Sequence, residues 1–490
     1  MEQKARDWEL VPISQALDSK FGFDIYPTEF NKIAGDLSLV KLSDPIYLRA
    51  KAVGDPRAPI IKKGAEITNE IINTFLKKNC TVLPVLRDKP LQLKTLSDFA
   101  KKQTLLLAGR IFNVVDSWLD DIRKDRSVSV LHTVRRYRKP LLQSLNNALK
   151  DWEAVTITLV NDILCAKESL SILSLFDEFI GGEAKQIRQK EHSIEVTVLA
   201  LMLGRKCNLN VHELKNLGLA GLIHDIGMVV YEQKLHELME VGGQLLEPDI
   251  IKTYFDKHPF YGAILLSKKN GEPIAGINSL VRSIVLEHEQ KIDGAGPRIK
   301  DKELKDELEA MNIPENVIYL GSNKILPDAS KPKEMFFPGT NVVKRYMSIS
   351  SQILHVSEMY VSTLDRFKRR GVKDPHKETI KVMVKQAGTR INGRIFEVFF
   401  NHLIPPEYYP ENLVITLNTR SAALDKTHIG YHKCIGVVFT EVGPDGKSTK
   451  KLRIFKGPDG KDLQKKITFD MNEEKKRMYL VIDDWNRYNK

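Results

Sequence analysis

The sequence predicts a multidomain protein with a mainly α central helical domain, a small α+β N-terminal module and a small β-rich C-terminal domain. Three observations support this prediction. The chain has 490 residues, which at roughly 150 residues per domain corresponds to about three domains. Apolar residues recur at helical spacing through the middle of the chain. After Pro405 and Pro406 the pattern changes to the alternation that is typical of strands.

The N-terminal part mixes short apolar runs with Pro and Gly. Residues 58–85 predict a strand, a glycine turn, a helix and a second strand, with Thr68 at the N-cap of the helix. The apolar face of that helix consists of Ile71, Ile72 and Phe75. We expect a sensory or docking module over 1–95, followed by a helical linker region over 96–184.

The pattern is almost entirely helical from residue 185 to about 297, and helix resumes over 346–403. The segment between them, 298–345, is charged at first and then rich in Pro, Gly and Asn. We expect this segment to be an inserted loop with little regular structure, of a length that is usually functional or mobile. The central domain is therefore predicted over 185–403, with this insertion.

The C-terminal domain is predicted over 404–490. Its five alternating segments are LVITLN, CIGVVFTEV, KLRIFKG, KKITFDM and RMYLVIDDW. The tetrapeptide PDGK occurs at 444–447 and 458–461 and supplies Asp-Gly turn chemistry. A cluster at 428–432, with His428, Tyr431 and His432, lacks a carboxylate or cysteine that would complete a site. We interpret that cluster as the edge of a strand.

Composition limits the class of protein. Apolar residues make up 42% and charged residues 28% of the chain, as in soluble globular proteins. No apolar run approaches the roughly 18 residues of a membrane span, and the N-terminus lacks the pattern of a signal peptide. The four cysteines show no CxxC spacing, which argues against a disulfide framework or a zinc ribbon. A cytoplasmic location is the resulting expectation.

The net charge of +12 favours an anionic ligand or partner. Basic clusters occur at 135–139 and 366–370, where solvated helix faces are the simpler interpretation. No zinc-finger, basic-zipper or RNA-recognition signature accompanies them. The sequence therefore argues against a nucleic-acid polymer as partner and leaves a small phosphate ligand open.

Five clusters of histidine and acidic residues lie on the central helical stretch. They are KEHSIEV with His192, LAGLIHDIGM with His224 and Asp225, DKHPFYG with His258, LEHEQKIDGAGP with Glu287, His288, Glu289 and Asp293, and SQILHVSEMY with His355 and Glu358. Each alone is compatible with a surface or core residue, a helix cap or a charged turn. Together they predict a metal site, because a divalent ion satisfies imidazoles and carboxylates that would be costly to bury alone. Two such ions would activate a water and clamp a phosphoryl group, which suits hydrolysis of a phosphodiester.

These motifs follow one another as HS, HDIG, HP-x-x-G, HE-x-x-x-DG-x-G and an acid in IL-x-V-x-[acid]-x-Y. This order resembles the HD-GYP branch of the HD phosphohydrolases over about 185–403. The segments at 386–400 and 409–418 are also similar to the family, and the module at 58–85 resembles a domain often found before it. The resemblance implies a helical domain that binds iron or manganese and hydrolyses cyclic di-GMP in bacterial signal transduction.

The resemblance also implies roles for individual residues. The implied metal ligands are His192, His224, Asp225, His258, His288, Glu289 and Glu358, of which His224 and Asp225 are also the implied catalytic pair. The implied substrate-binding positions are Asp293, Gly294, Gly296 and Arg298. Glu358 stands where the family has Asp. In an ungapped alignment Glu289 replaces the second histidine of the HHE motif, and with a gap 287–289 would cover that motif. We prefer the ungapped register because it aligns Asp293 and Gly294.

Three departures from the family bear on activity. Met228 replaces the lysine of HDxGK, and the tyrosine of GYP is missing after Gly296. Arg298 could replace part of the lost phosphate contact, because a guanidinium forks onto phosphate oxygens. Arg188 replaces the acid that three-metal members carry, so we expect two divalent ions at most.

Three functions therefore stay open. The protein is an active metal-dependent phosphodiesterase, a receptor that binds a cyclic dinucleotide or a protein partner without turnover, or a scaffold with a vestigial pocket. The first is the leading hypothesis, because most of a two-metal shell is present.

Overall fold

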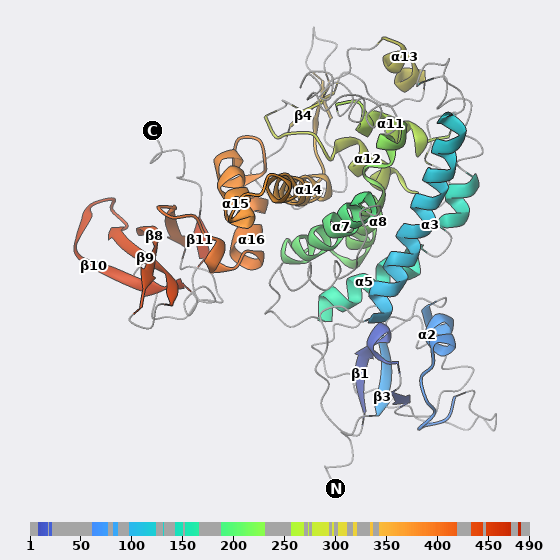
Figure 1. Cartoon of the computed structure of the whole chain (residues 1–490), viewed down its shortest axis with the longest axis horizontal. Helices are drawn as coiled ribbons and strands as arrows, with labels where there is room; N and C mark the ends of the chain where they lie inside the picture. Colours follow the sequence, from blue (N-terminus) through green and yellow to red (C-terminus); the bar gives the residue numbers. More distant parts are fainter. Residues whose placement is uncertain are drawn as a thin grey trace. The chain divides into compact units, whose positions relative to one another are not determined.

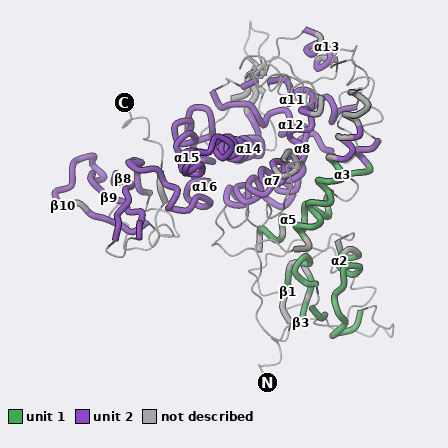
Figure 2. The backbone as a smooth tube through the Cα atoms, in the orientation of Figure 1, with its two compact units in different colours: residues 1–112, 147–170 green, residues 113–146, 171–490 purple. Residues whose placement is uncertain are grey.

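The described part of the chain is mostly helical, with a small sheet-containing region near the C-terminus (Figure 1). The computed structural model describes residues 8–17, 19–21, 61–76, 82–86, 98–123, 131, 143–149, 152–165, 188–230, 256–268, 273, 277–293, 296–297, 302–310, 317–320, 334–336, 343–418, 433–443, 447–471 and 479–481. Two compact units are distinguished, residues 1–112 with 147–170 and residues 113–146 with 171–490 (Figure 2). The division falls within helix α3, Asp98–Arg123.

The first unit contains a three-stranded antiparallel sheet in the order β1-β3-β2. Its elements are β1 (Trp8–Pro12), η2 (Ile13–Gln15), β2 (Lys20–Phe21), α2 (Asn69–Leu76), β3 (Val82–Leu86), the first part of α3, and α5 (Trp152–Cys165). The predicted helix is present, and Ile72 and Phe75 are buried in the core of the unit. Thr68 accepts a hydrogen bond from the Ile71 amide, as an N-cap residue does. The predicted strand before the Gly64 turn begins at 58–60, which lie outside the described residues. After the turn, Glu66 forms an isolated bridge with Lys20.

The second unit is built on packed helices. They are α7 (Arg188–Lys206), α8 (Val211–Ile223), η4 (Ile226–Val230), α11 (His258–Leu265), α12 (Ser279–Glu287), α14 (Ile349–Arg369), α15 (Pro375–Gln386) and α16 (Gly393–Leu403). Helix α7 packs against α8 and α14, and α12 packs against α8, α11 and α14. This arrangement gathers the five motif segments around one centre.

The described residues of 298–345 lie in a helix and strands, where we expected a loop with little regular structure. This segment contains helix α13 (Lys302–Ala310) and strands β4 (Val317–Leu320), β5 (Glu334–Phe336) and β6 (Val343–Tyr346), the last reaching one residue beyond it. Leu304 and Leu308 lie one turn apart and are fully buried, which explains a helix in a charged stretch. Strand β6 pairs in parallel with β4 and antiparallel with β5.

The C-terminal segment forms a five-stranded antiparallel sheet in the order β10-β9-β8-β7-β11, as its alternating pattern predicts. The strands are β7 (Val414–Asn418), β8 (Ile435–Val442), β9 (Ser448–Lys456), β10 (Asp462–Asp470) and β11 (Tyr479–Val481). The second PDGK turn is present, with Gly460 at a φ of +79° and the Gly457 amide donating to Lys461 at 2.8 Å. The cluster at 428–432 and the basic cluster at 135–139 lie outside the described residues.

Within the described ranges, no helix combines the length and the apolar character that a membrane span needs.

Candidate metal centre

Two histidines of the predicted set follow the ends of helices. His224 caps α8 and His288 caps α12, each with right-handed helical backbone angles. In both rings Nδ1 lies 2.7 Å from the carbonyl oxygen of the residue three positions earlier, which is Gly221 or Val285. A carbonyl oxygen only accepts, so Nδ1–H is the donor in both rings, and Nε2 is the nitrogen left to face the other residues of the centre. Both helix ends therefore direct the Nε2 atom of an imidazole toward the centre.

The carboxylate of Asp225 lies between two pairs of imidazoles. Its Oδ2 is 3.4 Å from Nε2 of His224 and 3.8 Å from Nε2 of His192. Its Oδ1 is 3.2 Å from Nε2 of His258 and 3.8 Å from Nε2 of His288. Since each carboxylate oxygen faces a different pair, Asp225 is placed to be shared between two cations.

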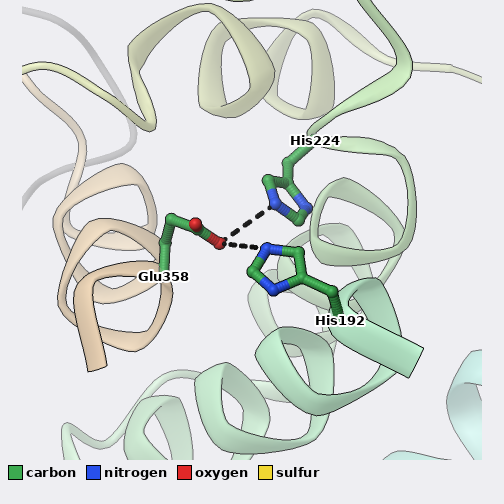
Figure 3. Close-up of side chains that lie close together, drawn as sticks. All are labelled: His192, His224 and Glu358. Atoms are coloured by element: carbon green, nitrogen blue, oxygen red, sulfur yellow. Dashed lines mark hydrogen bonds and ion pairs between the residues drawn. The ribbon is translucent and has the colours of Figure 1, made fainter. Parts of the chain in front are cut away.

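Glu358 on α14 points toward two of these histidines (Figure 3). Its Oε2 lies 2.9 Å from Nε2 of His192 on α7 and 3.1 Å from Nε2 of His224. Its Oε1 accepts a hydrogen bond from the hydroxyl of Ser362, one turn further along α14. One ligand atom from each of His192, His224 and Glu358 lies within 4.8 Å of the others. These three residues are the first ligand group.

A second ligand group consists of His258, His288 and Glu289, whose ligand atoms also lie within 4.8 Å of one another. Nε2 of His258 is 2.9 Å from Nε2 of His288. Both rings are almost fully buried. Two ring nitrogens at this distance need either a shared proton or a cation between them and the neighbouring carboxylate.

Close backbone packing brings the motifs together. A Cβ atom on Gly221 would lie 2.7 Å from Oγ1 of Thr197, so a side chain there would push α8 away from α7. A Cβ atom on Gly227 would lie 2.0 Å from the carbonyl oxygen of His258. The glycine of the HDIG motif thus permits the contact between η4 and the start of α11.

The two central carboxylates stay ionised. Burial alone would raise the pKa of Asp225, but the nearby His224 and His258 hold it well below its usual range. The pKa of Glu358 is lowered in the same way, because His192 and His224 outweigh the effect of burial. Burial raises the pKa of Glu289.

The pKa values of the imidazoles differ, although the rings surround the same carboxylates. Burial lowers the pKa of His192, but the carboxylate of Glu358 more than compensates and raises it to about 9. Burial, together with His258 and His224, lowers the pKa of His288 to about 3. The ring of His288 is therefore neutral near pH 7, which is the form that binds a metal ion.

The residues fit divalent metal ions. Nε2 of His224 is fully buried and lies 3.1 Å from Glu358 and 3.4 Å from Asp225, yet it makes no hydrogen bond with any described residue, whereas buried polar atoms normally have a hydrogen-bond partner. A metal ion would provide that partner and would offset the charges of Asp225 and Glu358. The cysteines of the described chain, Cys207 and Cys434, belong to neither ligand group.

Other predicted residues lie around the centre or outside the description. Glu287 turns away and accepts a hydrogen bond from Ser351 at 2.7 Å, so Glu289 rather than Glu287 faces the histidines. Asp293 is exposed and belongs to neither ligand group. A Cβ atom on Gly296 would lie 2.1 Å from Oε1 of Gln290, which ties the loop closely to the centre. Gly294 and Arg298 lie outside the described residues.

A cavity of about 330 Å³ opens beside the carboxylates of Glu289 and Glu358. Its wall also includes Lys291, His355, Ser362, Arg366, Gln386 and Arg390. The motifs did not assign a role to most of these residues. Ser362 lies one turn after Glu358 on the helix, and this spacing could have indicated a supporting hydrogen bond. The contribution of Arg390 depends on tertiary packing and has no local signal.

Comparison with known proteins agrees with this geometry. Residues 190–320 match the family model described as HD domain, so this segment is similar to HD domains. A segment of 105 residues is 30% identical to a cyclic di-GMP phosphodiesterase of Pseudomonas aeruginosa. Both findings agree with the resemblance to HD-GYP-type proteins of the HD superfamily that the motif order indicates.

The aligned segment covers 21% of this chain and 23% of that relative. The chain therefore spans less than a quarter of the curated relative that it matches. No solved structure matches the chain significantly.

Proposed function

We propose that this protein is a metal-dependent phosphodiesterase that cleaves cyclic di-GMP or a related cyclic dinucleotide. The observation that carries the proposal is the position of Asp225, with one carboxylate oxygen toward each of two pairs of imidazoles. The HD domain and the phosphodiesterase relative support the same reaction class.

Two divalent ions, iron or manganese, would bind at the two ligand groups with Asp225 shared between them. Such ions supply an activated water and hold the phosphoryl group for in-line attack. The protein's own contribution is to fix the ligand atoms. The Nδ1–H donors of His224 and His288 orient both rings, and the hydroxyl of Ser362 holds the outer oxygen of Glu358.

The second candidate is a receptor that binds the cyclic dinucleotide without turnover. Met228 favours it, because this partly buried side chain offers no charge to a substrate phosphate where the family has a lysine. The predicted module at the N-terminus is then the part that we propose to sense a signal or dock a protein partner.

One assay separates these functions. The protein is loaded with Mn²⁺ or Fe²⁺ and incubated with cyclic di-GMP, and products are separated by chromatography. Linear dinucleotide or GMP that disappears in the His224→Ala/Asp225→Ala variant supports the enzyme. Binding without product supports the receptor, and the absence of metal and nucleotide binding contradicts both. Unfolding curves of wild type and variant establish that the variant is folded.

A further inference from the structure

The cavity beside the metal centre is lined by both acidic and basic side chains. Glu289 and Glu358, one from each ligand group, form part of its wall. Lys291, Arg366 and Arg390 line the same cavity and come from three separate segments. A ligand that fills this cavity therefore meets two of the metal ligands and three cations.

The three cations lie outside the ion pairs of the described chain. Arg366 and Arg390 are exposed, whereas Lys291 is half-buried. The neighbouring Arg369, by contrast, is paired with Asp365 at 2.9 Å and does not line the cavity. Cations that gather at a cavity in this way favour an anionic ligand.

Backbone contacts fix the positions of two of these cations. The amide of Ile292, next to Lys291, donates to the carbonyl oxygen of Arg390 at 3.1 Å. The amide of Arg390 donates to the carbonyl oxygen of Gln386 at the end of α15. The segment that carries Glu289 is thereby held against the connection between α15 and α16.

His355 adds a polar atom without a partner. Its Nδ1–H donates to the carbonyl oxygen of His288 at 2.7 Å. Nε2 is buried and makes no hydrogen bond with any described residue, although the side chain lines the cavity and the residue is only 4% exposed. Because Nδ1–H is the donor in that bond, Nε2 is the ring nitrogen that can accept a hydrogen bond.

We propose that this cavity is a second subsite for a dinucleotide. Lys291, Arg366 and Arg390 hold the phosphate that is not being cleaved, and Nε2 of His355 accepts a hydrogen bond from a hydroxyl or N–H of the attached nucleoside. The proposal rests on the proposed phosphodiesterase function. A volume of about 330 Å³ lies at the lower end of the range for small-molecule sites, which suits one nucleotide unit rather than a whole dinucleotide. Arginines are the side chains that best fit phosphate oxygens.

The test compares a substrate that has two phosphates with a substrate that has one. The Mn²⁺-loaded full chain is assayed with cyclic di-GMP and with bis(p-nitrophenyl) phosphate. We expect Arg390→Gln and Lys291→Gln each to raise KM for cyclic di-GMP by about ten- to a hundredfold, the cost of one charged hydrogen bond. The rate constants with bis(p-nitrophenyl) phosphate should stay within about twofold, because that substrate has no second phosphate.

Two further variants complete the test. Arg369→Gln is the control: it removes a nearby cation that does not line the cavity and should leave the rate constants with both substrates unchanged. His355→Asn keeps a donor in the position of Nδ1 and removes the acceptor. We expect it to raise KM for cyclic di-GMP by about tenfold while the metal content and kcat are retained. Equal losses with both substrates, or unchanged KM for cyclic di-GMP, would overturn the subsite.

Binding separates this proposal from the proposed function. If the wild-type protein shows no turnover, the phosphodiesterase proposal fails, and calorimetric titration with cyclic di-GMP decides the subsite. A ten- to hundredfold weaker Kd in Arg390→Gln, with wild-type binding in Arg369→Gln, supports it. No binding to the wild type, or the same Kd in all variants, overturns it.

Discussion

Helices α8 and α12 both end in a histidine followed by an acidic residue. At the end of α8 these are His224 and Asp225, and at the end of α12 they are His288 and Glu289. Both histidines lock their tautomer with the same 2.7 Å hydrogen bond to the preceding turn. The same local hydrogen bond therefore orients the histidine ring at the ends of both helices.

The acids differ in what surrounds them. Both oxygens of Asp225 face imidazoles, whose charge outweighs burial and lowers its pKa. Glu289 has His258 and His288 on one side and the cavity on the other, and burial raises its pKa. The acid at the end of α8 thus lies inside the metal centre. The acid at the end of α12 lies between the centre and the cavity where a substrate would bind.

The largest expected effect follows from removing the charge of Asp225. Asp225→Asn keeps the size of the side chain but no longer offsets two cations. We expect the content of both metals to fall below about half an equivalent, and the hydrolysis rate to fall by about a thousandfold or more, since the ions contribute several kcal/mol. Elemental analysis and initial rates measure the two quantities. Asp365→Asn, an exposed acid of α14, is the control, and retention of both metals in Asp225→Asn contradicts the shared role.

A smaller effect is expected at Glu289, which belongs to one ligand group only. Glu289→Gln should lose one equivalent of metal and about a hundredfold in rate, since even residues that only support ligands are worth about 10- to 100-fold. Glu289→His, which introduces the neutral imidazole ligand that the HD-GYP family has at this position, should keep both ions. If Glu289→Gln loses both ions, the ends of α8 and α12 do not bind their ions independently, which contradicts the separate roles of the two acids.

The sequence predicted which residues of the centre come together better than it predicted the residues around them. Histidines and acids in ordered motifs have a local pattern, so the two ligand groups contain residues that the motifs indicated. Arg390 has no such pattern, and the motifs included His355 without giving it a role. Arg390 faces the cavity because a loop packs against residue 292, which only the tertiary structure determines.

The same limit explains why the helix and strands described within 298–345 were not expected. Buried Leu304 and Leu308 make an amphipathic helix in a charged stretch, but two leucines in nine residues are a weak periodic signal. Strands β4, β5 and β6 are only three or four residues long and pair across gaps in the sequence. The longer alternating runs of the C-terminal sheet, such as β9, were predictable for the opposite reason.

The two ligand groups should also differ in their dependence on pH. In the metal-free protein the pKa of His192 is raised to about 9, so at neutral pH a bound ion displaces a proton from this ring. Burial lowers the pKa of His224 in the same group, but Asp225 and Glu358 raise it well above its usual value. Affinity at the first group should therefore rise with pH, by at most about a hundredfold per unit for the two protons. His288, with a pKa of about 3, releases no proton in this range.

Calorimetric titration with Mn²⁺ in two buffers of different ionisation enthalpy measures the protons released. We expect the release to persist in Glu289→Gln, which keeps the first group, and to decrease in His192→Gln. Equal release in the two variants would contradict the assignment of the proton to His192.

The smallest expected effect concerns the other ends of the same two helices. Asn210 and Glu213 form a capping box that begins α8, whereas Asn278 caps α12 and also donates to the side chain of Asn216 at 2.7 Å. Asn210→Ala should lower the free energy of unfolding by about 1 kcal/mol. Asn278→Ala should lower it by about 1 kcal/mol more, because it also leaves a buried side-chain partner of α8 unsatisfied. Urea unfolding measures both, and metal content should stay at the wild-type value in each. Equal destabilisation would indicate that the hydrogen bond between Asn278 and Asn216 adds nothing to the free energy of unfolding.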